Sequence, residues 1–359
     1  MKKRVFALLV LLYIFLTAIL AGNAYAEDAN SKKDMGGFNF EVIHPENQVD
    51  KKTGYFDLKM TPGQKQVVQI KLTNPSDIET TISVKLNGAK SNSNGVIEYG
   101  PTVIENDASL KYDFVDIVKG PDEVKIPPKG EKTIDLDITM PESSYDGIIT
   151  GGIEMQNITN EEQKPQSGSI LNKYAYLVGM ILKETDTEVK PELSLNKVYA
   201  NQKNYRNTVF VNFSNTQATF IEDMTVDVQV SGKGSDQVLY DTKKAAMRMA
   251  PNSMLDFPVS MQGERMVAGD YSAHIIVTAG ADRWEWDQDF TITDEEADKF
   301  NAEDVSLLQE SKINWTFIAG IVGGLFVLVI VTFFIVRKVG KKTKKKKRKK
   351  QPGTKPSRK

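Results

Sequence analysis

Cysteine is absent from this 359-residue sequence, and histidine occurs only twice, as His44 and His274. Disulfide bonds, thiolate catalysis and lipid attachment through an N-terminal cysteine are therefore excluded. A zinc site would need mostly carboxylate ligands, because the two histidines lie far apart in the sequence. We expect no metal and no cofactor.

Recognisable catalytic motifs are also lacking. No G-x-S-x-G elbow occurs, and the glycine-rich stretch YDGIITGGIEM (145–155) places Ile153 and Glu154 where a phosphate-binding loop needs lysine and a hydroxyl. We expect a turn at Asp146 and Gly147, then a strand in which Gly151 and Gly152 mark a bulge or a close backbone approach. Acidic pairs for glycoside hydrolysis are inevitable among 47 carboxylates, but nothing singles out one pair. We predict that the protein is not an enzyme, with a cell-wall glycan hydrolase kept as an alternative.

Two long apolar runs lie at the ends of the chain. The first follows Lys-Lys-Arg and ends in Ala24-Tyr25-Ala26, which predicts a signal peptide over residues 1–26 with cleavage after Ala26. The second, residues 315–336, has 22 residues without a charge, long enough for a transmembrane helix anchored at its outer edge by Trp315. We expect a single-pass protein of the cell membrane with its N-terminal part outside.

Residues 337–359 carry 14 Lys or Arg and no acidic residue, so we predict a cytoplasmic tail that follows the positive-inside rule. Its position beside a membrane span favours contact with anionic lipid over nucleic acid. Without the tail and the three basic residues of the signal, 29 basic residues stand against 47 acidic ones, a formal charge of −18. We therefore expect an acidic exterior that does not bind nucleic acid.

Alternation of apolar and polar residues with a period of two dominates residues 27–314. It is typical of half-buried antiparallel strands. One such stretch is TIDLDITM (133–140), in which Ile134, Leu136, Ile138 and Met140 share a face. Others are QVVQIKL, TISVKL, TVFVNF, TVDVQV and GDYSAHIIVTAG. This pattern recurs after roughly 130 residues and predicts an all-β fold of two tandem immunoglobulin-like β-sandwiches.

We place the first sandwich at residues 36–165 and the second at 166–300. The apolar stretch KYAYLVGMILKE (173–184) is a further strand that suits either sandwich. An acidic helix capped by Thr293 is expected to follow the second sandwich. Trp284 and Trp286 share a strand face, which favours packing in a core, with an exposed pair for sugar or protein contact as the alternative.

Four polar or aromatic residues at predicted turns of the first sandwich are our candidate ligand contacts: Asn94, Tyr99, Tyr145 and Asp146. Glycan binding relies on hydrogen bonds and aromatic stacking, which these side chains supply. Asn94 precedes Gly95, so its first role is a hairpin turn.

Several segments together resemble the WxL-interacting protein family of Gram-positive cell surfaces. They are GFNFEVIHPENQ (37–48), GYFDLKMTPGQKQ (54–66), MPESSYDGIITGGI (140–153), NKYAYLVGMIL (172–182), MAPNS (249–253), and the apolar span with its lysine tail. The resemblance covers nearly the whole chain after residue 26, in the expected order.

The resemblance implies a peptidoglycan-binding first domain and a host-binding second domain. It also implies WxL-domain cell-wall proteins as partners, and host extracellular-matrix or serum proteins as ligands in adhesion. This sequence has no Trp-x-Leu of its own, as expected of the partner of such proteins. From the residues alone, a single-span receptor remains an alternative to a surface scaffold.

Overall fold

The computed structural model describes residues 37–159 and 174–308, together with a few helical positions between 320 and 331. The predicted signal peptide lies outside the described residues, and so does most of the predicted span at 315–336. Within the described part, no helix is both long enough and apolar enough to cross a membrane.

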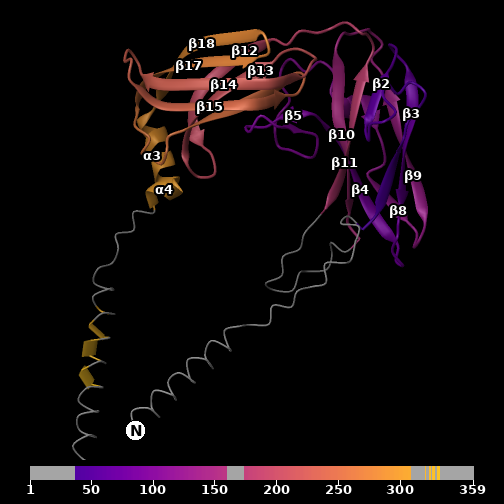
Figure 1. The fold of residues 1–359 in the computed structure, drawn as a ribbon, viewed down its shortest axis with the longest axis horizontal. Helices are drawn as coiled ribbons and strands as arrows, with labels where there is room; N and C mark the ends of the chain where they lie inside the picture. The colour runs from indigo at the N-terminus through magenta and orange to yellow at the C-terminus, as the bar shows by residue number, and fades with distance from the viewer. Residues whose placement is uncertain are drawn as a thin grey trace, which may run out of the picture.

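The first β-sandwich packs a four-stranded sheet, in the order β1-β3-β9-β7, on a five-stranded sheet, in the order β2-β11-β10-β4-β8 (Figure 1). The strands of the first sheet are β1 (Asn39–Ile43), β3 (Lys65–Thr73), β7 (Val118–Lys119) and β9 (Glu131–Thr139). Those of the second are β2 (Phe56–Lys59), β4 (Thr80–Gly88), β8 (Glu123–Ile126), β10 (Ile148–Asn157) and β11 (Ala175–Lys183).

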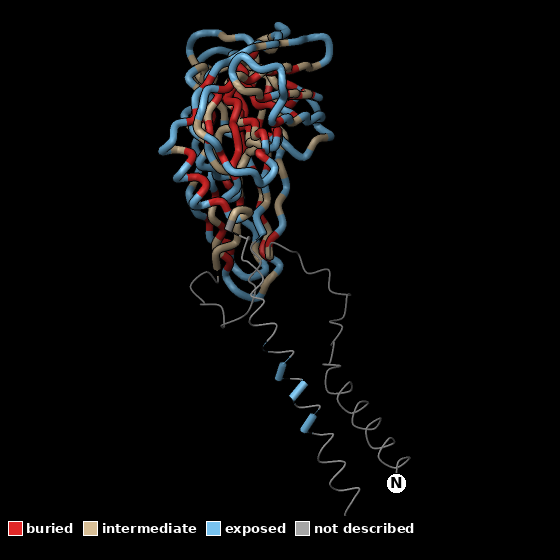
Figure 2. Tube along the Cα trace, turned by 90° about the vertical axis from the view of Figure 1, so that its left-hand side faces the viewer, coloured by how far each residue is buried: buried red, intermediate tan, exposed pale blue. Residues whose placement is uncertain are grey.

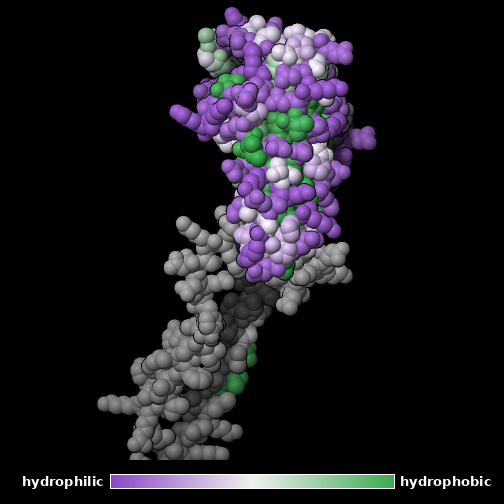
Figure 3. All heavy atoms as spheres, turned by 90° about the vertical axis from the view of Figure 1, so that its right-hand side faces the viewer, coloured by the Kyte–Doolittle hydropathy of each residue, from purple (hydrophilic) through white to green (hydrophobic). Residues whose placement is uncertain are grey.

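The predicted alternation appears as burial in both sheets. Ile134, Leu136 and Ile138 of β9 are buried, and the residues between them are exposed. These side chains join a single core with inward residues of the opposite sheet, such as Ile82 and Val84. Figure 2 shows buried stretches inside the folded part of the chain and exposed ones on its outside, and Figure 3 shows small apolar patches separated by polar residues on the side of the first sandwich.

The strand β11 belongs to the first sandwich. It pairs antiparallel with β10 along nine residues and parallel with β2. The strand pairing therefore places the division between the sandwiches after Lys183, later than residue 165.

The second β-sandwich packs a three-stranded sheet, in the order β12-β13-β16, on a four-stranded sheet, in the order β15-β14-β17-β18. Its strands are β12 (Leu193–Gln202), β13 (Asn207–Asn215), β14 (Ile221–Gly232), β15 (Val238–Met249), β16 (Ser253–Ser260), β17 (Gly269–Ala279) and β18 (Asp282–Ile292). In Figure 1 its strands run across the direction of those in the first sandwich. It has its own core, built around Val209, Val211, Phe213 and Phe257.

The tryptophan pair packs toward this core, as the favoured interpretation predicted. Trp284 and Trp286 are half-buried against it, and the ring of Trp286 lies 6.5 Å from that of Phe213. Two short helices follow, α3 (Asp294–Glu303) and α4 (Val305–Leu308). Thr293 caps α3 in a capping box with Glu296, which confirms the predicted cap.

Candidate functional site

A segment inserted between β4 and β7 of the first sandwich reaches the second. It contains a small hairpin of β5 (Lys90–Ser91) and β6 (Ile97–Glu98), and ends in the helix α2 (Phe114–Ile117). Arg248 donates its backbone N–H to the carbonyl oxygen of Gly95 at 2.8 Å, and Ala250 donates its own to Ser91 Oγ at 2.9 Å. The hairpin is thus hydrogen-bonded to the end of β15.

Glycine permits two of these close approaches. Gly95, with φ of +68°, lies where an added Cβ would stand 2.5 Å from Met247 Cβ. Gly147, with φ of +97°, lies where a Cβ would stand 2.3 Å from the carbonyl oxygen of Ala218 in the second sandwich. Its neighbour Ile148 donates its N–H to that same oxygen at 2.9 Å. A side chain at either position would push the sandwiches apart.

The glycine pair within β10 serves packing inside the first sandwich. The register of β10 with both neighbouring strands runs through Gly151 and Gly152 without a shift, so there is no bulge. A Cβ on Gly151 would meet the Phe114 ring at 2.3 Å, and one on Gly152 would meet the carbonyl oxygen of Tyr99 at 2.4 Å. The predicted close approach is confirmed.

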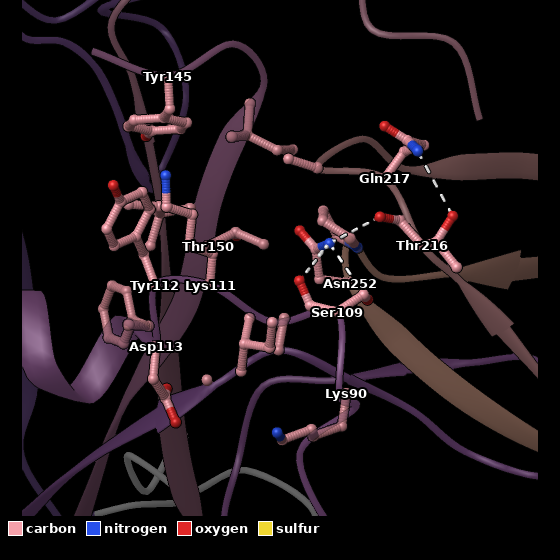
Figure 4. A pocket seen from close by; sticks show the side chains of 18 of the residues that line it. Lys90, Ser109, Lys111, Tyr112, Asp113, Tyr145, Thr150, Thr216, Gln217 and Asn252 are labelled. Carbon is pink, nitrogen blue, oxygen red and sulfur yellow. Dashed lines mark hydrogen bonds between the residues drawn. The ribbon is translucent and has the colours of Figure 1, made fainter. Parts of the chain in front are cut away.

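A pocket of about 230 Å³ lies at this junction, between the two sandwiches. The first sandwich supplies residues 88–90, 109–114, 145–146 and 148–150, and the second supplies residues 216–218 and 251–252. Asn252 joins the walls, since its side-chain amide donates to the carbonyl oxygens of Ser109 at 3.1 Å and Thr216 at 3.0 Å (Figure 4). Neither sandwich forms this pocket without the other.

Lys90 is the buried cation of the pocket. Its residue surface is only 8% exposed, and burial lowers the pKa of its ammonium, an effect opposed by the carboxylates of Asp113 and Asp107. Among the residues that the structure describes, none forms a hydrogen bond or ion pair with this ammonium. The group therefore has hydrogen-bonding capacity to spare.

Two tyrosines line the pocket away from Lys90. The rings of Tyr112 and Tyr145 lie 5.6 Å apart, tilted by 56°, and the Lys111 ammonium lies 4.9 Å from the centre of the Tyr112 ring. Tyr145 donates its hydroxyl to the carbonyl oxygen of Leu182 at 3.0 Å. Burial, and then the carboxylate of Glu184, raise the pKa of Tyr145, whereas hydrogen bonds with Lys111 and Ser143 lower the pKa of Tyr112.

The carboxylates of the pocket already have partners. Asp113 caps α2 by accepting the N–H of Val115 at 3.3 Å, and its other oxygen accepts the amide of Asn106 at 2.7 Å. Asp146 accepts the hydroxyl of Thr185 at 2.5 Å. These oxygens retain lone pairs for a ligand N–H or O–H.

The structure separates the four predicted contacts. Tyr145 and Asp146 line the pocket. Asn94 is at the hairpin tip, where it accepts the Lys203 ammonium at 3.0 Å, and Tyr99 packs against Gly152. The ligand-binding roles of all four stay predictions.

Lys90, Tyr112 and Asn252 were not predicted as pocket residues. Lys90 precedes a turn-rich stretch and looks like any exposed lysine, and Asn252 lies about 160 residues from it in the sequence. A weak signal for Asn252 was its Pro-Asn-Ser context, which marks a turn. Only the contact of the two sandwiches brings these residues together.

Outside the pocket, His274 contacts two carboxylates on the exposed face of β17 and β18, with Nδ1 2.7 Å from Asp287 Oδ1. Among the described residues, no three His, Cys, Asp or Glu side chains are grouped to hold a metal ion. The pocket itself offers ionic and hydrogen-bonding groups that suit a polar ligand.

Two family models match the chain in tandem. Residues 38–157 match "WxL Interacting Protein, peptidoglycan binding domain", and residues 165–302 match "WxL Interacting Protein, host binding domain". The second match includes β11, although that strand pairs in the first sandwich. No curated protein matches the chain.

Solved structures similar to the chain include fimbrial chaperones. The class 5 fimbriae chaperone CfaA is 13% identical, with 70% of this chain and 98% of CfaA covered and a TM-score of 0.26. The E. coli chaperone DraB is 11% identical, with 69% and 98% covered and a TM-score of 0.26. A PapD-like domain of human CEP192 is 9% identical, with 46% and 96% covered and a TM-score of 0.25.

Proposed function

This chain belongs to the WxL-interacting protein family, and from that premise we propose that it is a cell-surface protein that binds peptidoglycan through its first sandwich and a protein partner through its second. The partner is a WxL-domain wall protein or a host protein. Residues 315–336 anchor the chain in the cell membrane, with both sandwiches outside and residues 337–359 in the cytoplasm.

The observation that carries this proposal is the junction pocket, most of whose lining comes from the first sandwich. It combines a buried ammonium, two phenol rings and free amide and carboxylate lone pairs, which suits a polar wall polymer. The acidic exterior, with its formal charge of −18, argues against retention on the anionic wall by bulk charge. Binding must therefore use specific contacts.

The second sandwich suits a protein partner through its edge strand β15. Val238 and Leu239 are 45% and 44% exposed there, beside the exposed Lys243 and Lys244. An edge strand with unpaired backbone groups and exposed apolar side chains supports protein contact.

Sedimentation with insoluble peptidoglycan tests the proposal, using residues 27–310 and the two sandwiches cut after β11, as 27–188 and 189–308. Each piece retains its own core. We expect 27–310 to be retained at about 0.05 and 0.5 M NaCl alike, 27–188, which keeps only part of the pocket, to be retained more weakly, and 189–308 to stay in solution. Failure of 27–310 to sediment would overturn the assignment of peptidoglycan, and retention of 189–308 would reverse the assignment of the domains.

A further inference from the structure

We propose that the junction pocket binds the free carboxylate end of a short peptide, with the ammonium of Lys90 as its counter-ion. In the wall polymer such an end belongs to the peptide stem and not to the glycan strand. This inference rests on the proposed function for its source of ligand, and on the geometry of the pocket for its chemistry.

The state of Lys90 is the first argument. A charged group on a largely buried side chain is normally paired, and one without a protein partner is open to a ligand of opposite charge. Lys90 is more than nine-tenths buried as a residue, lines the pocket, and has no hydrogen-bond or ion-pair partner among the described residues. Its Nζ is not one of the described buried atoms that lack a partner, so water reaches the ammonium through the pocket and a ligand can do the same. A carboxylate is the group that satisfies an ammonium best, through a charge-assisted hydrogen bond.

The distribution of charge is the second argument. Figure 4 shows Lys90 at one end of the pocket, with Tyr112 and Tyr145 toward the other. The Tyr145 end carries Asp146, whose carboxylate can accept a ligand N–H, and Asn252 offers an amide oxygen for which no hydrogen bond is described. Asp113 also acts on Lys90 from the pocket lining, but each of its carboxylate oxygens already accepts a hydrogen bond. A cation at one end and acceptors beyond it match a peptide that ends in a carboxylate and continues through amide N–H groups.

The tyrosines are poorly arranged for a sugar ring, which is the third argument. Their planes are tilted by 56°, and the hydroxyl of Tyr145 is already bonded to Leu182. The volume of about 230 Å³ also lies below the usual range for drug-sized ligands, which begins at about 300 Å³. The end of a peptide fits such a space better than a disaccharide does.

Competition for insoluble peptidoglycan tests the inference with the full chain kept in mild detergent. The competitors are the pentapeptide L-Ala-γ-D-Gln-L-Lys-D-Ala-D-Ala as its free acid, the same peptide as its C-terminal carboxamide, and soluble glycan strands freed of peptide. We expect the acid to displace the protein, the carboxamide to be at least about tenfold weaker, and the glycan strands to have no effect. Displacement by glycan strands alone, or equal displacement by acid and carboxamide, would overturn the inference and leave the proposed function intact.

The variant Lys90→Met removes the ammonium and keeps the length of the side chain. We expect it to bind the free acid at least about tenfold more weakly in a direct calorimetric titration. Lys132→Met is the matched control, since Lys132 is an exposed lysine on β9 of the same sandwich and does not line the pocket. Lys90→Arg should recover part of the affinity.

The direct titration also separates the two proposals. If the full chain does not sediment with peptidoglycan but binds the free acid in a manner that depends on Lys90, the proposed function fails and the pocket assignment stands. Equal affinity of the parent chain and Lys90→Met for the acid would overturn the pocket assignment, whatever the sedimentation shows.

Discussion

Tyr145 donates its hydroxyl to the carbonyl oxygen of Leu182 at 3.0 Å, and the centre of its ring lies 5.6 Å from that of Tyr112. Its side chain therefore ties the segment before β10 to the end of β11 while it lines the pocket. The sequence singled out Tyr145 as a polar aromatic residue at a turn, which located it near the pocket but did not predict this hydrogen bond. If replacement of Tyr145 weakens binding, the cause is therefore either the lost hydrogen bond to Leu182 or a lost contact with the ligand, and binding data alone do not separate the two.

Tyr145→Phe should lower the free energy of unfolding by about 1 kcal/mol, because the carbonyl oxygen of Leu182 loses a partner. Tyr205→Phe is the control, since Tyr205 is 69% exposed on a loop of the second sandwich. Urea denaturation of residues 27–310 measures both variants. Equal stability of Tyr145→Phe and the parent would show that water replaces the hydroxyl.

Lys90→Met should raise the free energy of unfolding at neutral pH by up to about 1 kcal/mol, because it removes a charge from a largely buried side chain whose ammonium has water but no described protein group as a hydrogen-bond partner. Burial places the folded-state pKa of Lys90 below 10.5, its ordinary value. The folded chain then loses this proton first as the pH rises, and the destabilisation fades between the folded and the unfolded pKa. The advantage of the variant over the parent should therefore be full at pH 7 and much smaller at about pH 11.

Urea denaturation of parent and variant at both pH values measures the difference in their free energies of unfolding. Groups that titrate in the same way in both proteins contribute nothing to this difference. Lys111→Met should show no such gain, since Lys111 is exposed. A gain for Lys90→Met that is equal at the two pH values would contradict an effect of charge.

At the scale of elements, the β5–β6 hairpin fastens the two sandwiches together. Its tip contacts Met247 and Arg248, and its first strand contacts Ser253 through a hydrogen bond of 2.6 Å between Ser91 Oγ and Ser253 Oγ. Asn94 and Gly95 were predicted to form a turn, and they do. The sequence did not predict what the turn touches, because nothing in a hairpin motif specifies a surface more than 100 residues away.

Gly95→Ala should lower the free energy of unfolding by about 1 kcal/mol for the positive φ, and by a further 1–3 kcal/mol for the overlap with Met247. Gly63→Ala is a matched control, because Gly63 has φ of +67° but no atom within 4 Å of an added Cβ. Urea denaturation measures both, and small-angle scattering measures separation of the sandwiches. Equal decreases in the free energy of unfolding of the two variants would mean that the hairpin tip moves away from Met247 at no cost in stability.

The strands were predictable where one face is buried, because a period of two then identifies the strand and shows which of its side chains face the core. This holds for β3, β9, β14 and β17. The strand β11 was predicted as a strand, but its sandwich was not, because its partners β10 and β2 are chosen by the packing of the whole sheet. The acidic helix was predictable from its cap, since Thr293 and Glu296 have the spacing of a capping box.

At the scale of the whole molecule, the pocket exists only in the assembled pair of sandwiches. Its lining comes from segments as distant as residues 88–90 and 251–252. No sequence pattern reports such a meeting, so the candidate contacts from the sequence included two pocket residues, Tyr145 and Asp146, and missed Lys90.

Residues 27–310 should bind peptidoglycan at least about tenfold more tightly than residues 27–188, because the shorter piece lacks the wall formed by residues 216–218 and 251–252. Sedimentation over a range of peptidoglycan concentrations measures the two affinities. As a control, residues 189–308 are added as a separate chain to 27–188, to test whether the two sandwiches reassemble and complete the pocket. Equal affinities of 27–188 and 27–310 for peptidoglycan would mean that the peptidoglycan-binding surface lies on the first sandwich, away from the junction pocket.

The position of β11 in its sheet also bears on biogenesis. A chain emerges from the ribosome, or from a translocation channel, with its N-terminus first, and β11 is the last strand of the first sandwich to appear. Until then β2 has no neighbour in its sheet, and β10 presents an open edge of the kind that invites intermolecular pairing. The first sandwich can close only after residue 183 has emerged, so a chain stalled before that point is a natural client for holding chaperones and quality-control proteases.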